Sequence, residues 1–193
     1  VLADIEEMNE DGLRVILIGY KSDNEPAGSA TAADEDDLIL VGYLAFLDPP
    51  KESTREALQD LESDGIKVKI LTGDNAAVTK AVCKRVGLPA AKVYTGSQLE
   101  EASEDELAGM VEECDIFVKL SPELKTRIIT ALKAKGHIVG YMGDGINDAP
   151  AMKAADVSVS VDTAVDIAKE SADIILLHKD LRILENAVRI GRK

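Results

Sequence analysis

Three short groups of polar residues in this sequence could act on a phosphoryl group. The first is Thr72-Gly73-Asp74-Asn75, which follows an apolar stretch and precedes a helical pattern. A hydroxyl beside the free backbone N–H groups of a helix start suits an oxyanion such as phosphate. The same residue types are also common in turns, where Asp74 or Asn75 would cap the helix. Taken alone, this group favours the turn.

The second group is the stretch GDGINDAP at residues 143–150. It brings two carboxylates, Asp144 and Asp148, and the carboxamide of Asn147 together with two glycines, which leave the backbone open to a ligand. Mg²⁺ prefers oxygen ligands and usually binds through one or two carboxylates, waters and a phosphate. Helix capping needs fewer acidic groups than this stretch holds. The pattern therefore favours a magnesium site over a plain Gly-Asp turn.

The third group is a single residue, Lys125, one turn into a helix that Ser121 and Pro122 are expected to start. Its ammonium could neutralise a phosphoryl oxygen, although a lone lysine is more often a solvated surface residue. One hydroxyl, one magnesium carboxylate and one lysine together predict a phosphoryl-transfer site. Such a site needs a nucleophile, and no Asp-x-Asp or Asp-x-Thr pattern follows a predicted strand.

A parallel sheet would bring these groups together, because ligands bind at the carboxyl ends of its strands. Unbroken runs of Val, Ile and Leu alternate with helical patterns, which predicts an α/β fold, a Rossmann-like parallel sheet with helices on both faces. We expect strands at 66–71, 116–120, 137–142, 157–161 and 174–177, and helices at 51–64, 76–86, 103–114, 148–155 and 163–171, with further helices from 121 and from 181.

The first part of the chain follows a different pattern. Residues 12–20 and 38–47 are expected to form a β-hairpin, joined by a mobile, acidic loop at 22–37. The two prolines of Asp48-Pro49-Pro50 then predict a stiff hinge before the regular part of the chain.

The composition excludes several classes of function. The chain has 36 acidic and 22 basic residues, a net charge of −14, which disfavours binding to a nucleic-acid backbone. Aromatic residues make up 3% of the chain, too few for base-stacking platforms. No apolar stretch approaches the roughly 20 residues of a membrane helix. Cys83 and Cys114 have neither metal-ligand spacing nor a disulfide framework, so we expect buried thiols in a reducing compartment.

Three of these motifs together resemble a known family. Asp48-Pro49-Pro50, Thr72-Gly73-Asp74-Asn75 and the GDGINDAP stretch are similar to signature motifs of P-type cation-transporting ATPases, whose phosphorylation domain is of the haloacid-dehalogenase type. Residues 44–52 and 161–177 resemble the bacterial magnesium-transporting branch most. The resemblance implies an ATP-driven membrane pump with Mg²⁺ and ATP as cofactors and an aspartyl-phosphate intermediate, with this part soluble at the cytoplasmic face. A proton or calcium pump, a soluble phosphatase of the same superfamily and a non-enzymatic regulatory module are the alternatives.

The resemblance also implies a role for each site residue. Asp144 would ligate the catalytic Mg²⁺, with Asp148 as a second ligand that also pairs with Lys125. Asn147 would order the site. Around the phosphoryl group, Thr72 and Gly73 would donate hydrogen bonds and Lys125 would bind the oxygens. On the nucleotide side, Arg14 would contact ATP phosphate and Asp74 would lie near the nucleotide. Lys119 stands where many members of the family have Arg.

The family's nucleophile is the Asp of an Asp-Lys-Thr-Gly-Thr motif, which this sequence does not contain. We therefore expect a fragment, with 1–47 from the nucleotide-binding domain, 48–185 from the phosphorylation domain and 186–193 starting a stalk helix. Its partners would be the nucleotide-binding, actuator and membrane domains of the same pump chain. The lost nucleophile strand should leave an unpaired sheet edge or a groove, filled by self-association or by residues 12–20.

Overall fold

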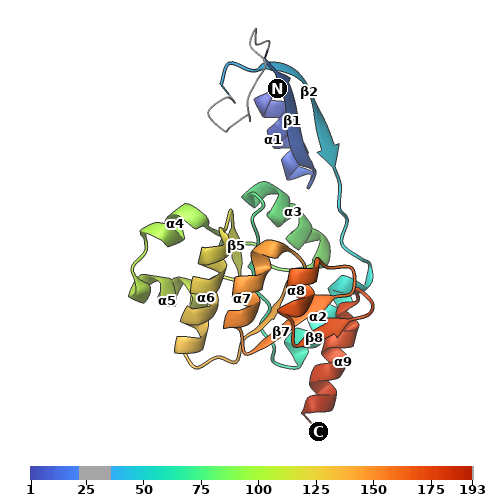
Figure 1. Ribbon diagram of the computed structural model, residues 1–193, viewed down its shortest axis with the longest axis vertical. Coiled ribbons are helices and arrows are strands. Elements are labelled where there is room, and N and C mark those ends of the chain that lie inside the picture. Colours follow the sequence, from blue (N-terminus) through green and yellow to red (C-terminus); the bar gives the residue numbers. More distant parts are fainter. Residues whose placement is uncertain (22–35, 193) are drawn as a thin grey trace.

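The computed structural model describes residues 1–21 and 36–192, so the predicted loop at 22–37 lies almost entirely outside the described residues. Two three-stranded parallel sheets form the body (Figure 1). The first has the order β3-β5-β4 and the second the order β6-β7-β8. Their bounds are Ile70–Leu71 for β3, Ile116–Val118 for β5, Tyr94–Thr95 for β4, Gly140–Met142 for β6, Val157–Val161 for β7 and Ile174–Leu176 for β8. The predicted α/β class with parallel strands is confirmed.

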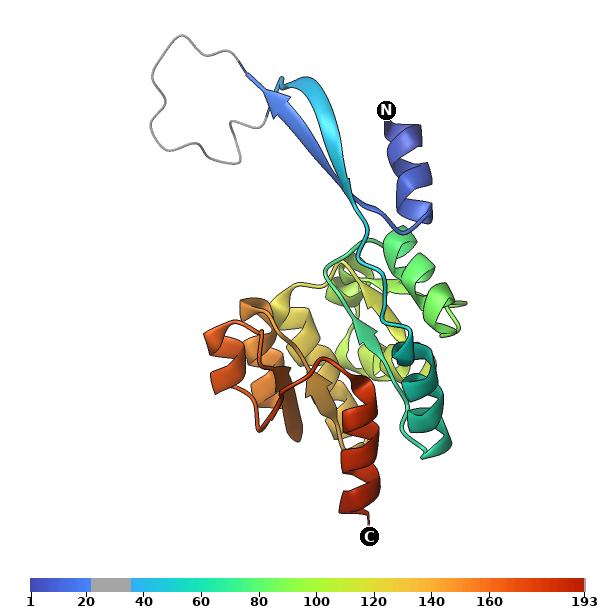
Figure 2. The ribbon, with the colours of Figure 1, turned by 90° about the vertical axis from the view of Figure 1, so that its right-hand side faces the viewer.

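Helices pack in two groups on opposite sides of these strands (Figures 1 and 2). One group runs from α4 to α8, with α6 in contact with α4, α5 and α7. In the other group, α2 contacts both α3 and α9. The bounds are Ser53–Ser63 for α2, Ala76–Val86 for α3, Gly96–Glu101 for α4, Glu104–Glu113 for α5, Pro122–Ala134 for α6, Ala149–Ala154 for α7, Asp166–Glu170 for α8 and Leu181–Gly191 for α9.

Local sequence signals account for the helices that hold the polar groups. The Asn75 side chain accepts a hydrogen bond from the Val78 N–H at 3.0 Å, and α3 ends at Gly87, whose φ of +80° suits glycine. The hydroxyl of Ser121 accepts from the Leu124 N–H at 3.3 Å, and Pro122 stands in the first turn of α6. These caps bear out the predicted starts of both helices.

Helix α6 holds the two sheets together. Its Ile128 is fully buried in a cluster with Phe117 of β5, whereas the neighbouring Ile129 is buried in a second cluster with Met152 of α7. Since adjacent helix residues point to different sides, one helix face packs on each half of the body. The residue at position 125 is thereby placed between the two halves.

The predicted unpaired edge is present. β3 and β6 are both terminal strands of their sheets, and within the described residues no other strand pairs with their free edges. Leu71 of β3 packs against both main core clusters, so this edge faces the second sheet. The expectation that residues 12–20 fill the gap is wrong. β1, Arg14–Tyr20, pairs instead with β2, Ile39–Phe46, in the antiparallel hairpin.

That hairpin and helix α1, Leu2–Glu10, stand away from the two sheets (Figure 2). Consecutive β1 residues point to opposite faces, and Ile16, Leu17 and Ile18 are each more than two-fifths exposed. Both faces of the hairpin are therefore apolar and open. The sequence patterns did not predict α1, which has no side-chain cap and no buried residue, nor β4 and α4.

Several observed elements are shorter than predicted. The apolar or helical sequence pattern extends beyond the residues that form the regular backbone hydrogen bonds of the strand or helix. β3 covers only the end of the predicted strand 66–71, β6 only the end of 137–142, and α8 starts three residues into the predicted helix 163–171. Among the described residues, no helix is both long and apolar enough to cross a bilayer.

Candidate active site

The Asp148 carboxylate is the centre of a dense hydrogen-bond network at the end of β6. Its Oδ1 atom accepts from the ammonium of Lys125 at 2.7 Å and from the phenol of Tyr141 at 2.8 Å. Its Oδ2 atom accepts from the N–H groups of Gly145 at 3.1 Å and Asp144 at 3.3 Å. The side chains of Lys125 and Asp148 are only 12% and 14% exposed. The implied pairing of these two residues is present, and both carboxylate oxygens are occupied.

This environment keeps Asp148 ionised. Burial alone would raise the pKa of its carboxyl, but hydrogen bonds from Lys125, Tyr141 and the Gly145 N–H outweigh burial and lower that pKa below its usual value. Burial and the adjacent Asp148 anion raise the pKa of Tyr141, which stays a neutral donor. The sequence patterns missed Tyr141, although a tyrosine inside a buried strand needs a partner for its hydroxyl.

The Asp144 loop has a fixed backbone and an exposed side chain, whose carboxylate lies 3.6 Å from the Lys179 ammonium. The Gly143 N–H donates to the Val159 carbonyl at 3.1 Å, the buried Ser160 hydroxyl donates to the Gly143 carbonyl at 2.9 Å, and the Val165 N–H donates to the Asp144 carbonyl at 3.2 Å. The Asp144 side chain itself is 63% exposed. It is therefore the carboxylate of this stretch that remains open to a ligand.

A glycine at position 143 is required by close packing against the site. A Cβ atom added there would lie 2.5 Å from the Cβ of Asp148, closer than real contacts allow. A Cβ at Gly145 would meet Asp148 at an ordinary 3.4 Å. The first glycine of the GDG turn thus lets the backbone pass the anchoring carboxylate.

The Thr72 group forms a turn that is closed on itself. The Thr72 hydroxyl donates to the Asp74 carboxylate and accepts from the Asp74 N–H, both at 3.1 Å. Arg14 of β1 reaches the other oxygen of the Asp74 carboxylate at 3.8 Å. Around Gly73 there is space, since an added Cβ would meet only the Leu120 carbonyl, at 3.8 Å. Asn75 caps α3, as the turn interpretation of this group anticipated for Asp74 or Asn75.

Lys119 and Leu120 form a short strap, which joins this turn to the helix that carries Lys125. The Lys119 N–H donates to the Asp74 carbonyl at 2.9 Å, and the Leu120 N–H donates to the Thr72 carbonyl at 3.0 Å. Lys119 adopts a left-handed backbone with φ of 53°. Helix α6 starts just after the strap. The Thr72 group and the Lys125–Asp148 pair are thus connected through the backbone, and the hydrogen bonds and ion pairs of the described residues show no direct side-chain contact between them.

The remaining polar groups of the GDGINDAP stretch are arranged less tightly. Asn147 lies in a 3₁₀ turn, Ile146–Asp148, and within residues 1–21 and 36–192 its side chain makes no hydrogen bond. In the same described ranges, no three side chains of His, Cys, Asp or Glu gather into a metal-binding cluster. A cation at Asp144 would therefore take its other ligands from water, a substrate or other parts of a longer chain.

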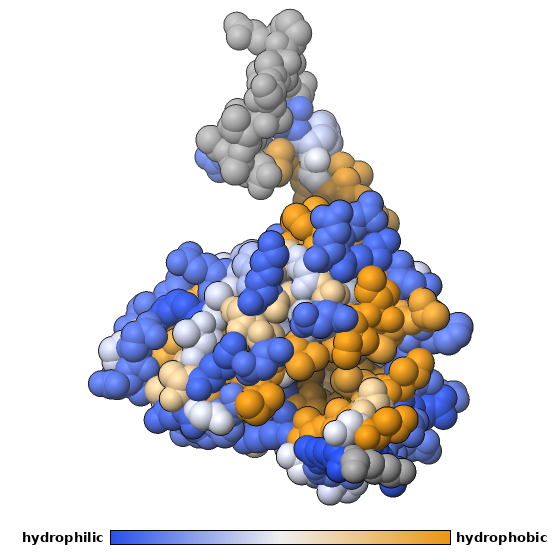
Figure 3. Space-filling view, turned by 60° about the horizontal axis from the view of Figure 1, so that its bottom comes forward, coloured by the Kyte–Doolittle hydropathy of each residue, from blue (hydrophilic) through white to orange (hydrophobic). Residues whose placement is uncertain are grey.

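A hollow of about 350 Å³ lies next to Asp144. Its walls come from β6, β7, β8 and the starts of α2 and α9, and two lysines are among the lining residues. Figure 3, which brings the bottom of Figure 1 forward, shows hydrophobic side chains gathered around a hollow on the face of the molecule seen there. The lining residues are Lys51, Ser53, Thr54, Met142, Gly143, Asp144, Val161, Leu176, Lys179, Asp180 and Leu181.

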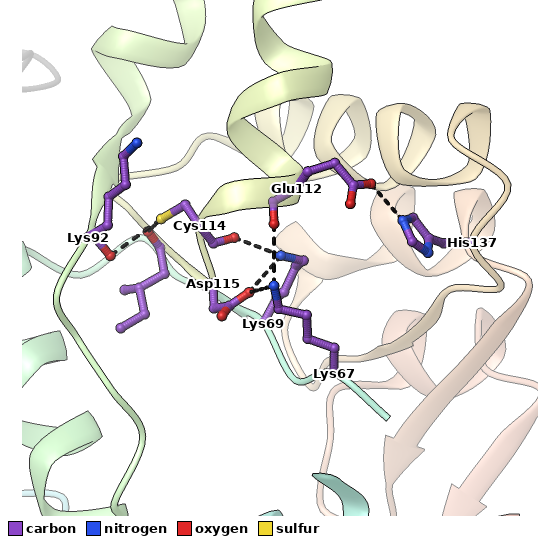
Figure 4. A network of polar contacts seen from close by, with 8 residues as sticks. Lys67, Lys69, Lys92, Glu112, Cys114, Asp115 and His137 are labelled. Atoms are coloured by element: carbon purple, nitrogen blue, oxygen red, sulfur yellow. Dashed lines mark hydrogen bonds and ion pairs between the residues drawn. The ribbon is translucent and has the colours of Figure 1, made fainter. Parts of the chain in front are cut away.

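A second polar network, at the opposite end of the strands, is structural (Figure 4). Asp115, just before β5, pairs with Lys69 at 2.7 Å and Lys67 at 3.1 Å, and Glu112 pairs with His137 at 2.6 Å. Lys67 and Lys69 share the single Asp115 carboxylate, so both ammonium groups here are held in ion pairs. Cys83 and Cys114 are buried and unpaired, as expected.

The fold and this site define the class of protein. The chain belongs to the haloacid dehalogenase-like hydrolases, whose family model matches residues 5–156.

Comparison with individual proteins refines that assignment. The chain is 54% identical over 188 residues to the Magnesium-transporting ATPase, P-type 1 of Escherichia coli K12, covering 97% of this chain and 21% of that protein. The Salmonella typhimurium LT2 protein of the same name is 53% identical over the same shares. The Calcium-transporting ATPase of Bacillus subtilis is 34% identical, over 98% of this chain and 22% of that protein. The resemblance to P-type ATPases is confirmed, and the chain spans about a fifth of the length of these relatives.

Proposed function

We propose that this chain is the phosphorylation-domain part of a P-type ATPase that couples ATP hydrolysis to cation transport. The observation that carries the proposal is the Lys125–Asp148 pair at 2.7 Å, one loop away from the open carboxylate of Asp144. The Asp148 carboxylate holds the Lys125 ammonium and also accepts from the Asp144 N–H at 3.3 Å, and an ammonium and a metal-binding carboxylate linked in this way suit a transferring phosphoryl group.

The reaction would begin with in-line attack by an aspartate from another part of the pump on the γ-phosphorus of ATP. The bond to ADP breaks, an acyl phosphate forms, and water later hydrolyses it to inorganic phosphate and the carboxylate. Mg²⁺ at this site would neutralise negative charge on the phosphoryl oxygens. Positioning and charge neutralisation carry most of the catalysis in this chemistry.

The chain's own residues divide this work. Asp144 fits Mg²⁺ because it offers an exposed oxygen donor on a fixed backbone. Asp148 suits an anchoring role better than that of a second metal ligand, since both of its oxygens already accept protein hydrogen bonds. Lys125 would bind phosphoryl oxygens, Thr72 and Gly73 would donate hydrogen bonds to them, and Asn147 would order the loop.

The nucleotide side of the site would be formed by Arg14, Asp74 and Lys119. Arg14 reaches from the hairpin to within 3.8 Å of the Asp74 carboxylate, so the cation that would contact an ATP phosphate lies beside the Thr72–Asp74 turn. Lys119 offers a point charge in place of the bidentate arginine found in many members of the family.

We propose the same domain boundaries as the sequence indicates. Residues 1–47 would complete a nucleotide-binding domain, residues 48–185 would form the phosphorylation domain and residues 186–193 would start a stalk. The open apolar faces of the hairpin fit a sheet completed by other parts of a longer chain. The 185/186 boundary falls within α9, which runs unbroken from Leu181 to Gly191.

The missing strand has a defined place in this proposal. The free edges of β3 and β6 and the apolar hollow beside Asp144 would accept the strand that carries the nucleophile. When expressed alone, the chain would cover these edges by self-association. Light scattering tests this statement, and a strictly monomeric solution at every concentration would contradict it.

The transported cation is proposed to be Mg²⁺, because identity to the two magnesium-transporting relatives exceeds identity to the calcium-transporting one, at 54% and 53% against 34%. A calcium or proton pump is the alternative. Uptake of Mg²⁺ by cells that lack their own magnesium transporters, on expression of the full gene, tests the choice. Transport of Ca²⁺ without uptake of Mg²⁺ by these cells would contradict the choice of Mg²⁺.

The catalytic proposal is tested with phosphate-release and phosphoenzyme assays. The intact pump should form an acid-stable phosphoenzyme from ATP, and Asp144→Ala or Lys125→Met should lower its formation at least a hundredfold, since each removes charge stabilisation. The 193-residue chain alone should release no phosphate from ATP. Mg²⁺-dependent hydrolysis by this chain, lost in Asp144→Ala, would instead identify a phosphatase with its own nucleophile.

A further inference from the structure

We propose that Lys179 competes with Mg²⁺ for the Asp144 carboxylate, so that its ammonium holds the metal-free site and lowers its affinity for the ion. The inference rests on the proposed metal role of Asp144. It assigns a function to the loop between β8 and α9, which none of the predicted motifs includes.

The geometry brings one cation to one open carboxylate. The Lys179 Nζ atom lies 3.6 Å from the Oδ2 atom of Asp144, and both residues line the hollow beside β6. Asp148 cannot attract this lysine in the same way, because Lys125 and Tyr141 already occupy its Oδ1 atom. Asp144 is thus the carboxylate of the loop that does not take part in the Lys125 network, and Lys179 is the cation that pairs with it.

The backbone of Lys179 is held in place, whereas, among the described residues, its side chain is held only by the ion pair with Asp144. The ammonium of Lys51 donates to the Lys179 carbonyl. The next residue, Asp180, caps α9 by accepting from the Arg182 N–H at 3.1 Å, and its carboxylate also accepts from the Ser53 hydroxyl. The Lys179 side chain remains 46% exposed. A fixed backbone with an exposed ammonium on a long side chain allows the cation to meet Asp144 and to withdraw from it.

Two cations that share one carboxylate oxygen repel each other. For a divalent ion and an ammonium about 5 Å apart in water-like surroundings, the repulsion corresponds to roughly a fifteenfold loss of affinity. Screening at physiological salt reduces this to about fourfold. Removing the charge of Lys179 should therefore strengthen Mg²⁺ binding, and added salt should shrink the difference.

The experiment is a Mg²⁺ titration of the ¹⁵N-labelled chain followed by NMR at the amides of Asp144 and Gly145. Lys179→Gln is expected to bind Mg²⁺ about fourfold more tightly than the unchanged chain. Lys67→Gln is the matched control, because it removes the same charge from an exposed lysine, paired with Asp115 at the opposite end of the strands. It should leave the affinity within about 1.5-fold of the unchanged chain, since Lys67 is exposed at the other end of the strands, where solvent and salt screen its charge.

Two outcomes overturn the inference: Lys179→Gln binds Mg²⁺ no more tightly than Lys67→Gln, or it binds the ion more weakly than the unchanged chain. Asp144→Asn separates this failure from failure of the proposed function. If Asp144→Asn removes Mg²⁺ binding and Lys179→Gln has no effect, only the competition is refuted. If Asp144→Asn leaves binding intact, or no variant shows Mg²⁺-dependent shifts at these amides, the metal assignment itself fails.

Discussion

Breaking the Lys125–Asp148 pair offers the most direct test of the site's architecture. Asp148→Asn keeps the size of the side chain but leaves the Lys125 ammonium, which is 12% exposed, without its anion. Loss of one partner of a fully buried ion pair costs about 3–5 kcal/mol. Because this pair retains a little solvent contact, we expect a loss of about 2–3 kcal/mol in the free energy of unfolding. In a chain of this size that corresponds to a fall in Tm of roughly 5–10 °C.

The assay is urea unfolding at pH 7 followed by far-UV circular dichroism. Asp166→Asn is the matched control, because Asp166 is 92% exposed and pairs with Lys169 at the surface, so its loss should cost under about 0.5 kcal/mol. The double variant Lys125→Met/Asp148→Asn should recover part of the loss, since it removes the uncompensated charge. A cost for Asp148→Asn no larger than that of the control would refute the anchoring role of this carboxylate.

Further predictions concern the same loop. Tyr141→Phe removes one hydrogen bond to Asp148 and should cost about 1 kcal/mol by urea unfolding, and an unchanged midpoint would exclude a role for the phenol. Gly143→Ala should destabilise by more than about 2 kcal/mol through overpacking against Asp148, whereas Gly145→Ala, with ordinary contacts, should cost under about 1 kcal/mol; equal losses would contradict the packing argument. The lowered pKa of Asp148 means that its contribution to stability is present above the unfolded pKa, about 3.9, and is lost as pH falls through the lower folded pKa. The difference in unfolding free energy between the unchanged chain and Asp148→Asn should therefore shrink below about pH 4, and a pH-independent difference would disprove this linkage.

Much of the fold could be predicted because its signals are local. Helix α3 has the predicted bounds, set by the Asn75 cap and by Gly87 in the left-handed region. Strand β7, Val157–Val161, also matches, since a β-branched valine at every second position favours a strand. Helix α1 carried no such signal, because it has neither a cap nor a buried face.

The site was predictable in part for the same reason. Asp144 and Asp148 stand out in the sequence as more acidic groups than a turn requires, and Lys125 stands in a clearly signalled helix. Which of the two carboxylates is open was not predictable. That distinction depends on Tyr141 and on backbone N–H groups that converge on Asp148 after folding.

The sequence by itself determined the order of strands and helices, the capped helix starts and the motifs that point to phosphoryl chemistry, because each depends on residues a few positions apart. Only the tertiary structure decided that the strands form two separate sheets, that Tyr141 joins Lys125 on the Asp148 carboxylate, and that Lys179 meets Asp144. The physical reason is that contacts between distant segments depend on how helices such as α6 pack against both sheets, and no local pattern encodes that packing.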